Sequence, residues 1–125
     1  HKIMNIWVGF GGHADGDENI ARVAQREVNE ESGIEQVQFA LDGIWDIDIH
    51  PIPFNAKKNE PAHCHFDISF LFQVTGHDNF VLSDESHNLR WCSLAEAEIL
   101  SPKGTDLHMD RMFRKWQRFI AAKGL

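Results

Sequence analysis

The feature that most constrains this chain is the segment GGHADGDENIARVAQREVNEESGI, residues 11–34, which mixes glutamates with apolar residues. On a helical wheel of about 100° per residue, its apolar side chains form one arc, which should pack on the core. They are Ile20, Ala21, Val23, Ala24 and Val28. Glu31 lies near the middle of that arc, Glu27 on its flank and Glu30 at its edge. We therefore expect a helix with acidic side chains towards its buried side.

Two explanations of these glutamates are open. An acidic helix is most often a solvated face. Burying ionised carboxylates, however, is costly unless they are paired or bind a metal. Glu27, Glu30 and Glu31 would also repel one another across neighbouring turns. A divalent cation removes both costs, and oxygen ligands favour Mg²⁺ or Mn²⁺ over zinc. Arg26 can reach Glu30 at i+4 and fix the direction of its carboxylate.

The spacing of these residues also matches a known pattern. Gly12 is followed after five residues by Glu18, and after seven more by Arg-Glu-Val-Asn-Glu-Glu-Ser-Gly-Ile, residues 26–34. This agrees with every fixed position of the Nudix box. The chain therefore resembles the Nudix hydrolases, a family that cleaves nucleoside diphosphates linked to a further group.

The resemblance implies a role for each matching residue. Glu27, Glu30 and Glu31 would bind divalent cations, Mg²⁺ or Mn²⁺, with help from the carbonyl of Gly12. Arg26 would orient the glutamates, and Glu18 would support the geometry between loop and helix.

A further acid from a later loop often completes a metal shell or serves as general base in this family. Glu85, in LSDESHNLRW, is the candidate, with Asp84 behind it. The alternative for Glu85 is an exposed loop acid without a catalytic role. His13, inside the box loop, is either a contact for a substrate phosphate or an exposed loop histidine.

Outside the box, the chain alternates between strand and helix patterns, which indicates an α/β fold. The box helix should have Asp17 as its N-cap and end at Ser32, with Gly33 in the C′ position. Ser93 and Glu96 form a capping-box pattern for a short helix, and a last helix should end before the C-terminus. The expected strands lie at 37–41, at 44–52, at 63–74 and on either side of the acidic loop near residue 84.

The resemblance implies a Nudix-type α/β/α sandwich with a mixed sheet, in one domain spanning residues 1–125. The family fold normally has at least one long strand upstream of the box. Only ten residues precede Gly11. Either the numbering starts inside the domain, or an edge of the sheet is absent.

The stretch PAHCHFDISF raises a second question about metal binding. His63, His65 and Asp67 alternate on one face of a strand, and Cys64 points to the other. If the preceding strand closes a hairpin, His50 joins the same face. A second metal site built from His50, His63 and His65 is one interpretation. The other is that these histidines border the cleft and bind substrate or hydrogen-bond across the strands.

Composition narrows the partners. The 125-residue chain has a formal net charge of −7, which disfavours binding to nucleic acid or anionic membranes. The two cysteines fit reduced thiols in a cytoplasm. No apolar run approaches a membrane span. We expect a cytoplasmic protein whose partner is a small nucleoside diphosphate derivative, with a homodimer left open.

The predicted function is metal-dependent hydrolysis of a pyrophosphate bond that releases a nucleoside monophosphate. Two alternatives remain: a non-catalytic nucleotide-binding or regulatory module that kept the box, and isomerase chemistry on a prenyl diphosphate. The complete set of glutamates favours hydrolysis over isomerisation.

Overall fold

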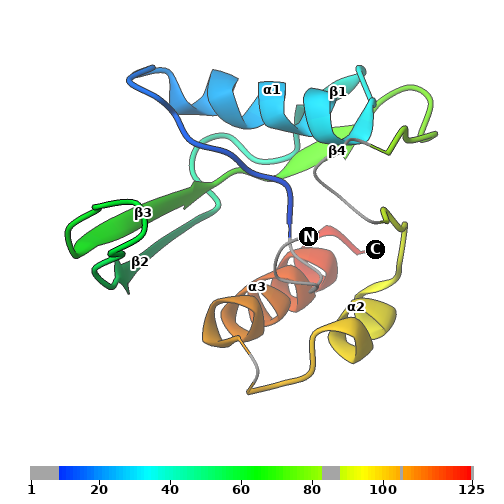
Figure 1. The fold of residues 1–125 in the computed structure, drawn as a ribbon. Coiled ribbons are helices and arrows are strands. Elements are labelled where there is room, and N and C mark those ends of the chain that lie inside the picture. Colours follow the sequence, from blue (N-terminus) through cyan, green and yellow to red (C-terminus); the bar gives the residue numbers. More distant parts are fainter. Residues whose placement is uncertain (1–8, 83–87, 105, 125) are drawn as a thin grey trace. The chain divides into compact units, whose positions relative to one another are not determined.

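A computed structural model describes residues 9–82, 88–104 and 106–124, and the chain divides into two compact units (Figure 1). The first unit, Phe10–Val81, contains the box helix and every strand among the described residues. Its elements are α1 (Ile20–Ser32), β1 (Val37–Phe39), β2 (Asp46–Ile52), β3 (His63–Ser69) and β4 (Phe72–Val74). The second unit includes the chain from Leu82 onward, with α2 (Leu94–Leu100) and α3 (Leu107–Lys123).

Helix α1 ends as the sequence predicts but starts later. Gly33 adopts a left-handed φ of 72° after the last turn, and its N–H donates to the carbonyl of Asn29. The N-cap is Asn19, whose Oδ1 accepts from the Arg22 N–H at 3.1 Å. The prediction of Asp17 as N-cap is therefore wrong. Asp17 instead accepts from the N–H of Asn19 at 2.9 Å, so it stabilises the turn that leads into the helix.

The strands form two antiparallel pairs, β2 with β3 and β1 with β4. The predicted continuous strand at 63–74 is divided between them. Ser69 ends its pairing with β2 by accepting from the Trp45 N–H at 2.8 Å. Leu71 then accepts from the Ala40 N–H at 2.8 Å, beside β1. The apolar run changes partner at this point. It is also not covered on both faces, because Phe66 is 66% exposed.

The α/β class is confirmed, and the pairing differs in detail from the prediction. Within the described part of the chain, the strands pair only antiparallel and no mixed sheet forms. The strands expected on either side of the acidic loop are absent from residues 80–82 and 88–93. The expectation of a single domain over residues 1–125 stays a prediction.

Each unit has its own buried residues. In the first unit, Val23, Ile34 and Trp45 are buried apolar side chains. In the second, Met112 and Phe113 are buried on α3.

The second unit's helices have the predicted caps and ends. Ser93 caps α2 and accepts from the Glu96 N–H at 3.2 Å, as the capping-box pattern predicts. Helix α3 ends at Gly124, with a left-handed φ of 71°. Neither these helices nor α1 is long and apolar enough to cross a membrane.

Alanine substitution of two glycines can distinguish backbone strain from steric crowding. Gly33 directly follows α1, and Gly16 lies in the loop before it. Gly33 and Gly16 both have positive φ, which costs an L-residue about 1–2 kcal/mol. Only at Gly33 would an added Cβ meet another group, the Cβ of Val81 at 3.0 Å. We expect both alanine variants to lower the free energy of unfolding in urea titrations. Gly33→Ala should lose about 1–3 kcal/mol more, because it also overpacks. Equal losses would contradict the crowding.

Candidate metal and active site

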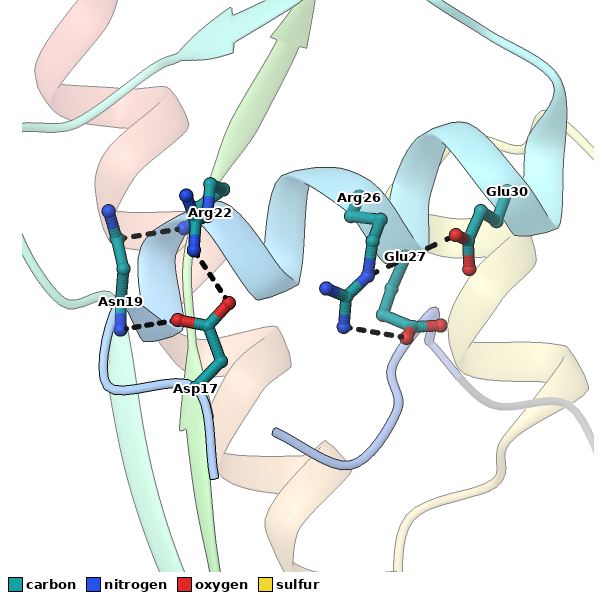
Figure 2. Close-up of polar contacts among 6 residues, drawn as sticks. All are labelled: Asp17, Asn19, Arg22, Arg26, Glu27 and Glu30. Carbon is teal, nitrogen blue, oxygen red and sulfur yellow. Dashed lines mark hydrogen bonds and ion pairs between the residues drawn. The ribbon is translucent and has the colours of Figure 1, made fainter. Parts of the chain in front are cut away.

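On helix α1, Arg26 forms ion pairs with two glutamates, Glu27 and Glu30 (Figure 2). Arg26 lies 3.9 Å from Oε1 of Glu27 and 3.9 Å from Oε1 of Glu30. The two carboxylates differ in burial, because the side chain of Glu27 is 15% exposed and that of Glu30 is 61% exposed. Arg26 therefore lies within ion-pair distance of both carboxylates.

The glycine loop before α1 approaches the same glutamates. A Cβ added at Gly12 would fall on the carboxylate of Glu27, so the lack of a side chain at Gly12 leaves room for that carboxylate. The N–H of Gly11 donates to Oε2 of Glu31 at 3.2 Å. The loop backbone and two carboxylates of α1 thus converge in one place, although Gly12, Glu27 and Glu31 are well separated in the sequence.

At the start of the helix, Asp17 makes the hydrogen bonds that join the loop to α1, and the supporting role implied for its neighbour Glu18 stays a prediction. Glu18 is exposed. Asp17 accepts from the Arg22 guanidinium at 2.8 Å and from the Asn19 N–H at 2.9 Å (Figure 2). These two hydrogen bonds hold the pKa of the Asp17 carboxyl below its usual value, because they stabilise the ionised form.

At the other end of the helix, box residues have structural roles that the sequence pattern does not reveal. The side-chain amide of Asn29 donates to the carbonyl of Ile34 at 2.7 Å and joins α1 to the segment before β1. Ser32 is fully buried, and its hydroxyl donates to the Val28 carbonyl at 2.5 Å and accepts from the Ile34 N–H at 3.1 Å. These bonds fix the last turn, which contains the metal-ligand candidates Glu30 and Glu31.

The donors at this site fit a hard divalent cation. Glu27 and Glu31 offer carboxylate oxygens beside the glycine loop, and the backbone carbonyl of Gly12 belongs to the same loop. Oxygen-only donor sets suit Mg²⁺ and Mn²⁺, which usually keep open positions for water and phosphate. Glu30 is the most exposed of the three glutamates. It lies about one helical turn after Glu27 and beside Arg26.

The histidines of the β2–β3 hairpin lie on one face, as predicted. The register pairs His50 with His65 and Asp48 with Asp67. Ligand atoms of His50, His65 and Asp67 all lie within 4.8 Å of one another. His63 is not in this group, and its Nδ1 donates to the carbonyl of Pro61 at 2.8 Å. The structure thus gives Asp67 the place that the sequence suggested for His63.

Of the predicted residues in loops, the structure describes His13 but not Glu85. His13 lies in the glycine loop, and its ring centroid is 5.9 Å from that of His65. The loop histidine therefore stands next to the hairpin cluster. Glu85, the candidate general base, and Asp84 lie outside the described residues.

The glycine loop, the acidic helix and the strands around them define a family. A sequence model of the NUDIX domain matches residues 2–116, and the chain belongs to the Nudix family. It is similar to a bis(5′-nucleosyl)-tetraphosphatase (asymmetrical) of Caenorhabditis elegans, with 28% identity over 115 residues. The match covers 92% of this chain and 76% of the relative.

Family membership and this relative identify the chain as a Nudix pyrophosphohydrolase. Nudix enzymes generally use divalent metals, and their substrates are small nucleotide derivatives. The donor set on α1 agrees with that chemistry.

The close approach at Gly12 can be tested with two adjacent substitutions. In Gly12→Ala the new methyl group would displace the Glu27 carboxylate, the far end of a flexible side chain, so the fold should persist. We expect hydrolytic activity to fall by about one to two orders of magnitude, because the ligand is misplaced. Gly11→Ala is the matched control, since its Cβ meets nothing within 4 Å and its N–H remains. Similar activity of the two variants would contradict the proposed contact.

Proposed function

We propose that the protein hydrolyses the pyrophosphate bond of a nucleoside diphosphate linked to another group, with Mg²⁺ or Mn²⁺ on the glutamates of α1, and releases a nucleoside monophosphate. The supporting observation is the convergence of the glycine loop with Glu27 and Glu31. The N–H of Gly11 donates to Glu31, and Gly12 leaves room for the Glu27 carboxylate, which supports a single site shared by the loop and the helix.

In this proposal each residue has a distinct task. Glu27, Glu30 and Glu31 hold the cation, and the carbonyl of Gly12 is a further oxygen donor. Arg26 offsets the repulsion between the Glu27 and Glu30 carboxylates and orients them, at 3.9 Å from each. When bound, the cation neutralises phosphate oxygens and lowers the pKa of a coordinated water.

A carboxylate then accepts the proton of the attacking water. Glu85 is our candidate for this general base, and a glutamate of the box is the alternative. His13 and the hairpin histidines His50, His63 and His65 are proposed to contact the substrate from the hairpin side.

The net charge of the protein supports a cation-mediated encounter with the substrate. A chain with a formal charge of −7 repels a polyphosphate at long range. Binding of an anionic substrate therefore depends on the divalent cation as a positive bridge. This also disfavours a nucleic-acid polymer, whose binding requires many basic contacts.

The substrate panel should start from the similar nematode protein. Since that protein is named an asymmetrical tetraphosphatase, a dinucleoside tetraphosphate is the first candidate, followed by nucleoside diphosphate sugars, dinucleotides and coenzymes. The products decide between modes of cleavage. Unequal cleavage of a dinucleoside tetraphosphate gives a monophosphate and a triphosphate, and equal cleavage gives two diphosphates.

The roles of the box glutamates can be tested by amide substitution. Glu30→Gln and Glu31→Gln remove a negative charge and keep the side-chain shape. We expect each to reduce Mg²⁺-dependent turnover by about two to four orders of magnitude, with an unchanged circular dichroism spectrum. Glu35→Gln is the matched control, because Glu35 is exposed and lies just outside the box.

Two outcomes would contradict this proposal. Unchanged turnover in both box variants would exclude these glutamates as metal ligands. Binding of panel compounds without hydrolysis by the wild-type protein would instead indicate the non-catalytic module.

A further inference from the structure

The polar face of the β2–β3 hairpin places like groups opposite each other. Asp48 lies opposite Asp67. Two residues further along the strands, on the same face, His50 lies opposite His65. Like charges directly opposite each other destabilise an antiparallel pair. A cation held between the strands would offset this repulsion.

The distances within this face converge on one point. Nδ1 of His50 is 3.3 Å from Oδ2 of Asp48 and 3.4 Å from Oδ2 of Asp67. The ring centroids of His50 and His65 are 5.5 Å apart. Ligand atoms of His50, His65 and Asp67 lie within 4.8 Å of one another. These side chains are half-buried or exposed, and to hold one metal they would close in to ligand distances of about 2.0–2.2 Å.

We infer that His50, His65 and Asp67 bind one divalent cation of the Zn²⁺ class, at a site separate from the glutamates of α1. Two imidazole nitrogens and one carboxylate oxygen are a donor set that suits zinc and related transition metals and does not suit Mg²⁺. Three protein ligands leave a coordination position open to water or a phosphate oxygen.

The neighbours of the cluster strengthen this assignment. Oδ2 of Asp48 is 3.3 Å from the His50 ring, so a second carboxylate lies beside the cluster and can orient this imidazole. The ring of His63 is centred 5.1 Å from that of His65 and is anchored to the Pro61 carbonyl, so it packs beside the ligand.

The cluster also adjoins the box. His13 directly follows Gly12, the residue whose backbone meets the Glu27 carboxylate, and its ring lies 5.9 Å from that of His65. A metal held by His65 would therefore lie near the loop that contacts α1. A phosphate oxygen of a substrate bound at the box is a ligand of the right chemistry for its open coordination position. The metal site itself does not depend on the proposed hydrolysis.

Zn²⁺ binding to the chain without a polyhistidine tag tests the inference. Protein freed of metal is titrated with Zn²⁺ by calorimetry, in an excess of Mg²⁺ that occupies oxygen sites. Co²⁺ titration followed by visible absorption reports nitrogen ligation and low coordination number. We expect one equivalent to bind, and His50→Ala and His65→Ala each to weaken binding at least about tenfold. Asp67→Asn should weaken it as well, and it keeps the side-chain shape if an alanine variant misfolds.

Two controls make the result specific. His77→Ala removes an exposed histidine elsewhere in the same unit and should bind like the wild type. Glu30→Gln should retain the Zn²⁺ site even where it loses Mg²⁺-dependent turnover, so the two proposals can fail separately. Unchanged binding in His50→Ala and His65→Ala, or loss of binding in Glu30→Gln alone, would overturn the site.

Discussion

The site on α1 depends on the approach of the glycine loop to the carboxylates of Glu27 and Glu31. A helix that turns acids towards its buried side is unfavourable unless those acids have partners. The structure provides them in part. The N–H of Gly11 donates to Glu31, and the missing side chain of Gly12 leaves room for the Glu27 carboxylate. In the proposed site, a divalent cation would supply the remaining positive charge. The glycines, the glutamates and the arginine of the box thus relate to one physical constraint, the repulsion between partly buried carboxylates on α1.

The local parts of the fold and site were predictable because their causes are local. Helical spacing placed Glu27, Glu30 and Glu31 on one segment, and Gly33 ended the helix where a left-handed residue was expected. Alternation along the strands correctly placed His50, His65 and Asp67 on one face. Asp17 and Asn19 are both good capping residues, so sequence alone chose wrongly between them, and only the observed hydrogen bonds distinguish them.

Features that depend on distant partners were not predictable in this way. The apolar run from His63 to Val74 looks like one strand, but its two halves pair with different strands. The choice of Asp67 over His63 in the hairpin cluster depends on where ligand atoms lie, since alternation fixes only the face. The contact between the Gly11 N–H and Glu31 joins residues 20 positions apart, and nothing in the spacing identifies it.

The first unit thus combines two donor chemistries. The glutamates of α1 and the carbonyls of the loop are hard oxygen donors, and the hairpin offers imidazole nitrogens with one carboxylate. Divalent metals are selected by ligand type and geometry more than by overall affinity. The two groups should therefore bind different metals from the same solution. His13 belongs to the loop of the first group and touches the ring of His65 in the second, which makes the loop the physical link between them.

Anomalous diffraction tests the central claim most directly. Crystals soaked with Mn²⁺ and a non-hydrolysable pyrophosphate compound can be measured at a wavelength where manganese scatters anomalously. The account predicts a manganese peak ligated by Glu27 and Glu31, next to the carbonyl of Gly12, with a phosphate oxygen in its shell. A manganese peak confined to the hairpin histidines, or bound phosphate with no manganese at α1, would contradict it.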